Sequence, residues 1–186
     1  MRKILEYGGI VTGVLMIAFG IGAIWTGVDG RNTVRDSLAQ EGIVGTPDST
    51  IPGQKVDTGD EARAFANVMR KHALEATGGQ TYAQMGRFLD SQGNPTNDEA
   101  AAAKDPKTGQ PVENGARNLW VTETALSTAL NMSYMAERLA VFGIVVGIAL
   151  TLSGIGFIVL ALGGALRRSW TDAKEPVVIT RVQPQV

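Results

Sequence analysis

The sequence predicts an all-α fold: a two-helix transmembrane hairpin whose long helices extend into a small helical extracytoplasmic cap. Two observations predict it. No charged residue falls between Tyr7 and Val28 or between Leu139 and Leu166, whereas residues 29–138 carry 11 Lys+Arg and 15 Asp+Glu. A charge-free run of this length is the signal for a membrane-spanning helix, because about 20 helical residues cross about 30 Å of hydrocarbon. Two spans therefore bracket a polar middle.

Basic residues predict the orientation of both spans. Arg2 and Lys3 precede the first apolar run, and Arg167 and Arg168 follow the second. Lys and Arg in short flanks favour the cytoplasmic side of a membrane. We therefore expect a multi-pass protein of the inner (plasma) membrane with both termini in the cytoplasm. The predicted order is a cytoplasmic N-terminus (1–6), a first span (7–28), an extracytoplasmic stalk and cap (29–138), a second span (139–166) and a disordered cytoplasmic tail (167–186).

Aromatic residues agree with this topology. Tyr7 and Trp170 would lie at the inner membrane interface, and Trp25 and Tyr134 at the outer one, where amphipathic rings prefer to lie. The alternative is that the first run is a removable signal peptide, which would leave a single span. That run is longer than the usual 7–15 apolar residues of a signal peptide, and it lacks a strong cleavage pattern. We therefore expect it to be retained.

Glycine is frequent in both apolar runs and is spaced by seven residues. The first run has Gly13, Gly20 and Gly27, and the second has Gly147, Gly154 and Ala161; Gly9 with Gly13 and Gly143 with Gly147 form two GxxxG pairs. Small residues let membrane helices approach closely, and a spacing of seven keeps them on one face. We expect the two faces to pack together, or else to meet an oligomer or a larger partner.

The polar middle is expected to be helical without strands. The spacing of apolar residues after the first span predicts that its helix continues to about Gln40, and Gly42 predicts the end of that helix. The spacing of apolar residues before the second span predicts a helix of about fifty residues from Asn118 to Arg168. Between them we expect an amphipathic helix over residues 60–77, a shorter one over 81–90, and a loop over 91–115 with one helical turn at 97–104.

A thin apolar core should hold this region together. Its predicted members are side chains of the cap packed against side chains of the stalk. The cap contributes Phe65, Met69, Tyr82, Met85, Phe88 and Leu89, and the stalk contributes Val34, Leu38, Leu119, Leu126 and Leu130.

Residues for catalysis or metal binding are scarce. The chain has no cysteine and a single histidine, His72, with only Glu75 at ligand spacing on the same helix. A surface histidine is the expected role, and we predict no catalytic residue, metal or cofactor. Neither span contains an ionisable residue of the kind that marks an ion pathway. The net charge of −1 disfavours nucleic acid as a partner.

Two stretches carry a resemblance to known proteins. "EYGGIVTGVLMIAFGIGAIWTGVDGRNTVRDSLAQEGIVGTPDS" and "ARAFANVMRKHALEATGGQTYAQMGRFL" resemble a group of uncharacterised actinobacterial two-span membrane proteins. Some of these carry the label of an aromatic ring-opening dioxygenase. The resemblance implies an actinobacterial inner-membrane location. The dioxygenase label requires a non-haem iron site, for which one histidine is insufficient, and we reject it.

These features together predict a non-enzymatic membrane protein of the bacterial envelope. Its expected role is accessory or structural, or the binding of another membrane or envelope protein, or of its own copies, through the extracytoplasmic helices. The alternative is a sensor-like ligand-binding module that recruits a cytoplasmic output protein. A third possibility is a pore formed by oligomerisation.

Overall fold

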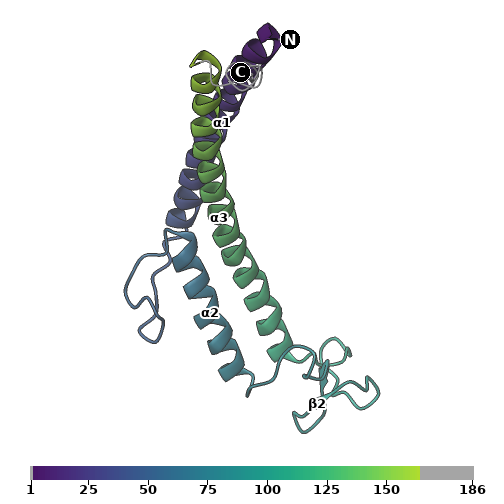
Figure 1. The fold of residues 1–186 in the computed structure, drawn as a ribbon. Helices are drawn as coiled ribbons and strands as arrows, with labels where there is room; N and C mark the ends of the chain where they lie inside the picture. The colour runs from purple at the N-terminus through teal and green to yellow at the C-terminus, as the bar shows by residue number, and fades with distance from the viewer. Residues whose placement is uncertain (1, 164–186) are drawn as a thin grey trace, which may run out of the picture. The chain divides into compact units, whose positions relative to one another are not determined.

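The computed structural model describes residues 2–163, with side chains from Glu6 onward. This part of the chain is mostly helical and contains three helices and two short strands (Figure 1). They are α1 (Arg2–Gln40), α2 (Gly59–Ala76), β1 (Phe88–Leu89), β2 (Pro95–Thr96) and α3 (Gly115–Leu162). The chain divides into two compact units, residues 1–28 with 142–186 and residues 29–141. We call them the apolar unit and the polar unit.

The predicted long helices are confirmed within the described residues. α1 ends at Gln40, and Gly42 follows with a φ of +62°, a conformation that glycine adopts without steric cost. α3 contains 48 residues and begins at Gly115, three residues before the predicted start. The earlier start has a local cause, because the side chain of Asn114 accepts a hydrogen bond from the N–H of Ala116 and caps the helix.

Both long helices are apolar enough to cross a membrane. Their most apolar 18-residue windows have mean hydropathies of 1.9 and 2.5. Only 11% and 17% of these windows is buried within the protein, so neither helix is the enclosed core helix of a water-soluble fold. Large apolar side chains such as Phe19, Phe142 and Leu152 are exposed. Apolar side chains exposed at this density need a covering other than water.

The prediction of an all-α fold is wrong in one region of the polar unit. β1 and β2 pair antiparallel, with Phe88 opposite Thr96. The turn between them is built by Asp90, whose carboxylate accepts the backbone N–H groups of Gln92 and Asn94, and by Gly93 at a φ of +84°. The expected helix over 81–90 is therefore absent. The expected helical turn at 97–104 is also absent, and isolated bridges pair Asp90 with Ala102 and Lys104 with Pro111 instead.

The core of the polar unit consists of two clusters. In the first, Leu38, Val56, Ala62, Ala66 and Leu130 are buried, and Val34, Phe65 and Met69 pack against them. In the second, Ala73 of α2 and Met85 contact Trp120 of α3. Figure 1 shows α2 alongside the part of α3 that supplies these contacts.

Three predicted core residues are exposed: Tyr82, which is 44% exposed in the segment after α2, and two leucines of α3, in whose place a neighbouring position on the helix is buried. Leu119 and Leu126 of α3 are 44% and 49% exposed. Trp120 and Glu123 face α2 instead, and each is about 95% buried.

Candidate functional site

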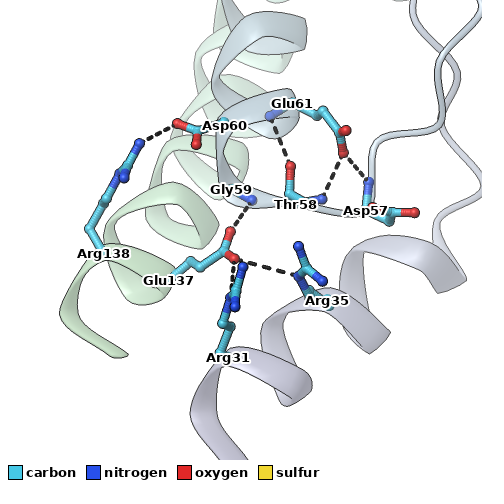
Figure 2. A network of polar contacts seen from close by, with 9 residues as sticks. All are labelled: Arg31, Arg35, Asp57, Thr58, Gly59, Asp60, Glu61, Glu137 and Arg138. Carbon is cyan, nitrogen blue, oxygen red and sulfur yellow. Dashed lines mark hydrogen bonds and ion pairs between the residues drawn. The ribbon is translucent and has the colours of Figure 1, made fainter. Parts of the chain in front are cut away.

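A buried carboxylate, that of Glu137, joins three segments of the polar unit (Figure 2). Its Oε1 lies 2.9 Å from Nε of Arg31 and 3.5 Å from Nε of Arg35, both on α1. Its Oε2 accepts a hydrogen bond of 2.5 Å from the backbone N–H of Gly59, the first residue of α2. Glu137 itself lies on α3, so one side chain connects the three helices of this unit.

The same contacts set the protonation of Glu137. Burial alone would raise the pKa of this carboxyl group. The hydrogen bonds from Arg31 and the Gly59 amide, together with the charges of Arg31 and Arg35, outweigh burial and hold the pKa below its ordinary value. Glu137 is therefore ionised at neutral pH.

Glycine is required where α2 meets α3. A Cβ atom on Gly59 would lie 2.8 Å from Cα of Tyr134 and 2.9 Å from Oε2 of Glu137, and both distances are shorter than a Cβ atom makes with non-bonded atoms. The start of α2 is further stabilised by a capping box. The hydroxyl of Thr58 accepts the N–H of Glu61, and the Glu61 carboxylate accepts the N–H groups of Asp57 and Thr58. These contacts place the N-terminus of α2 against α3.

A second polar group lies beside this network. The guanidinium groups of Arg63 and Arg138 lie 4.8 Å and 5.1 Å from the centre of the Tyr134 ring. Arg138 also forms an ion pair with Asp60 (Figure 2). Hydrogen bonding from the guanidinium groups of Arg138 and Arg63, together with their positive charges, lowers the pKa of the Tyr134 hydroxyl. These cations are paired with protein groups and are not placed around an open site.

The single histidine helps to hold a loop against α2. Nε2 of His72 lies 2.9 Å from Oδ2 of Asp48, which also accepts a 3.0 Å hydrogen bond from Lys71. The hydrogen bonds from Lys71, His72 and Thr46 hold the pKa of Asp48 well below its usual range. In residues 2–163, no group of three or more His, Asp and Glu side chains is arranged to hold a metal ion.

In the apolar unit the structure brings together four of the glycines singled out above. A Cβ atom on Gly13 would lie 2.6 Å from the carbonyl oxygen of Gly154, and one on Gly147 would lie 2.6 Å from the carbonyl oxygen of Gly20. The contacts pair residues in opposite order along the chain, so α1 and α3 are antiparallel here. Any side chain at these positions would force the two backbones apart. We call these contacts the glycine seam.

The remaining predicted helix-packing residues are Gly9, Gly27, Gly143 and Ala161. Gly27 and Ala161 are buried and Gly9 is half-buried. A Cβ atom on Gly143 would lie at an ordinary distance of 3.8 Å from the carbonyl oxygen of Ala23. In the second GxxxG pair, Gly147 therefore makes the close contact and Gly143 does not.

Of the predicted membrane-interface residues, Tyr7 and Trp25 belong to the apolar unit and Tyr134 to the polar unit. Tyr7 and Trp25 are exposed in the apolar unit, at 65% and 70%. Arg2 and Lys3 belong to the first turn of α1, and their side chains are outside the described part. Arg167, Arg168 and Trp170 lie outside the described residues.

One apolar surface of the polar unit is hollowed. Two adjoining pockets of about 400 Å³ and 330 Å³ share Met69 of α2 and Leu126 of α3. Leu38, Ile43 and Phe65 line the first pocket, and Ala73, Ala76 and Leu119 line the second. We call the combined surface the Leu126 groove. α2 and α3 are in contact in this unit, where the hydroxyl of Ser127 donates a 3.5 Å hydrogen bond to the carbonyl oxygen of Ala66.

The sequence pattern concealed two of the residues that organise this region. Glu137 stands one residue before Arg138 at the edge of an apolar run, where a charge is expected to face water. Trp120 belongs to a buried or half-buried stripe of α3, in which Ala116, Trp120, Glu123, Ser127 and Leu130 follow each other at intervals of three or four. The stripe has helical spacing, but its polar members made the face difficult to recognise.

No protein-family model matches the chain, and no significant match was found among curated proteins or solved structures.

Proposed function

We propose that this chain is a non-enzymatic integral membrane protein of the bacterial cell envelope that binds a protein partner through its polar unit. It crosses the bilayer twice as a helical hairpin, with both termini in the cytoplasm and the polar unit outside. The low burial of the two apolar windows supports the membrane location, because lipid is the covering that suits their exposed side chains.

The observation that carries partner binding is the uncharged exposed face of α3 beside the Leu126 groove. Between Arg117 and Arg138 the only charged residues of α3 are Glu123 and Glu137, and both are buried against other parts of the polar unit. Twenty residues of a helix outside the membrane thus present no exposed charge. Charged residues are depleted at the core of protein interfaces, and an apolar groove between two helices suits an amphipathic helix of a partner.

Site-specific photo-crosslinking in native membranes tests the partner directly. A benzophenone amino acid replaces Leu126 in the groove, and the matched control carries it at Gln92, in the exposed turn between β1 and β2. We expect irradiation to give a discrete heterologous product from position 126 and none from position 92. A product that contains only two copies of this chain would mean that the groove binds a second copy and not a foreign partner. Monomer alone at both positions contradicts partner binding through this groove.

Reporter fusions test the topology separately. A reporter that is active only outside the cytoplasm should be active when fused after Gly93 and inactive when fused after Val186. Activity at both positions would mean a single span, and inactivity after Gly93 would place the polar unit inside the cell. The crosslinking result and the topology result can fail independently, so each part of the proposal has its own test.

A further inference from the structure

Two further pockets meet on another part of the polar unit, and they share no residue with the Leu126 groove. The larger, of about 520 Å³, is an apolar groove along α3 that is lined by Trp120, Val121 and Ala125. The smaller, of about 200 Å³, is polar, and Arg87 and Arg117 line it. Tyr82 and Val121 line both pockets, so the apolar groove opens directly beside the two arginines.

The two arginines are held in place by stacking and not by carboxylates. The guanidinium of Arg117 lies 4.0 Å from the centre of the Tyr82 ring, and that of Arg87 lies 5.0 Å from the centre of the Phe88 ring. Stacking occupies the flat face of a guanidinium and leaves the N–H groups at its edge free to bind. Neither arginine forms an ion pair with a residue that the structure describes, whereas Arg31, Arg35 and Arg138 do.

The backbone around Arg117 is firmly positioned. Asn114 is buried, and its amide donates a 3.0 Å hydrogen bond to the carbonyl oxygen of Gly86 while its side-chain oxygen accepts the N–H of Ala116. This joins the start of α3 to the segment that carries Arg87. Glu113 also lines the polar pocket and offsets one of the two positive charges, which leaves the pocket with a net charge of +1.

We propose that this site binds a long-chain carboxylate of the fatty-acid type. The carboxylate would accept hydrogen bonds from Arg87 and Arg117, whose planar groups match a carboxylate's two oxygens. The alkyl chain would lie along Val121, Ala125 and Thr128 of α3.

The groove suits an alkyl chain better than an extended peptide. The wall formed by α3 is a helix whose backbone N–H and C=O groups are bonded within the helix, so a peptide lying on it would leave its own backbone groups unpaired. An alkyl chain has no such groups. This inference does not depend on the proposed protein partner, because the two surfaces have no residue in common.

Photolabelling of the full chain in lipid nanodiscs tests the site. The probe is hexadecanoate carrying a diazirine in its chain, and labelled peptides are mapped by mass spectrometry. We expect adducts on the α3 segment 121–128. Unlabelled hexadecanoate should compete, whereas hexadecanol, which also partitions into the bilayer but has no negative charge, should not. Labelling confined to the apolar runs 7–28 and 142–163, or equal competition by the alcohol, overturns the proposal.

Variants separate the head of the ligand from its chain. Arg117→Gln and Arg87→Gln should each weaken labelling of 121–128 about tenfold, as expected for loss of a hydrogen bond to a charged group. Lys107→Gln, which removes the same charge from an exposed turn, should leave labelling unchanged. Ala125→Phe fills the apolar groove without touching either arginine and should abolish labelling while far-UV circular dichroism stays native. Unchanged labelling in Arg117→Gln or in Ala125→Phe overturns the proposal.

Discussion

Replacing Glu137 by glutamine removes the charge that connects three helices and keeps the size of the side chain. We predict that Glu137→Gln lowers the free energy of unfolding of the polar unit by about 2–3 kcal/mol. The carboxylate accepts contacts from Arg31, Arg35 and the Gly59 amide. Glutamine has one acceptor oxygen, and its NH₂ group must then face either Arg31 or the Gly59 N–H, which are donors themselves.

The exposure of the two arginines limits this magnitude. Hydrogen bonds to charged groups contribute about 1.5–3 kcal/mol each, and breaking a fully buried ion pair costs about 3–5 kcal/mol. The side chains of Arg31 and Arg35 are 43% and 41% exposed, so they regain water when the carboxylate is lost. The expected cost is therefore below the value for a fully buried pair.

Fluorescence of Trp120 provides the assay, because this residue is buried in the polar unit. The other two tryptophans, Trp25 and Trp170, are replaced by phenylalanine, and the protein is unfolded with urea in non-ionic detergent. Glu137→Gln should lower the midpoint without changing the slope. The control Glu75→Gln, at a side chain 62% exposed, should change stability by less than about 0.5 kcal/mol. A Glu137→Gln protein as stable as the parent would refute the reasoning.

The pH dependence gives an independent check. A carboxyl group whose pKa is lowered on folding stabilises the folded state above its unfolded pKa, about 4.3 for glutamate, and this stabilisation is lost as pH falls through the folded value. Asp48, Asp90 and Asp105 also have lowered pKa values, so both proteins should lose stability in acid. The difference between the parent and Glu137→Gln should shrink from about pH 7 to about pH 3. A constant difference would show that the charge of Glu137 is not responsible.

Three further predictions address other contacts. Gly20→Leu should separate the helices of the glycine seam, since even a Cβ atom there would lie 2.6 Å from the carbonyl oxygen of Gly147. Because the chain has no cysteine, a cysteine pair introduced across the seam is the only source of a disulfide. That disulfide should form markedly more slowly in Gly20→Leu, and an unchanged rate would contradict this packing. Thr58→Ala removes the side-chain acceptor for the Glu61 N–H and should cost about 1 kcal/mol in the same urea assay, with Thr58→Ser close to the parent. Trp120→Ala should cost about 3–5 kcal/mol, measured by circular dichroism, and a loss below about 1 kcal/mol would mean that the second core cluster is not cooperative with the rest.

The sequence alone was sufficient for the long helices and for the face that carries the glycines. Helix lengths follow from charge-free runs and from local stop signals such as Gly42, and these depend on neighbours a few residues away. The spacing of Gly13 and Gly20 similarly defines one side of a helix. It does not define which residue lies opposite, and the pairing of Gly13 with Gly154 and of Gly20 with Gly147 comes from the tertiary structure.

The tertiary structure alone decided where the charged side chains of the polar unit lie. Arg31 and Glu137 are 106 positions apart, and Gly59 and Glu137 are 78 apart, so no local pattern connects them. The strands β1 and β2 escaped prediction because each has two residues, too few to show a periodicity. The burial of Trp120 and Glu123 in place of Leu119 and Leu126 also depended on α2. A helix shows its apolar face in its sequence, but the face that is finally covered is chosen by the element that packs against it.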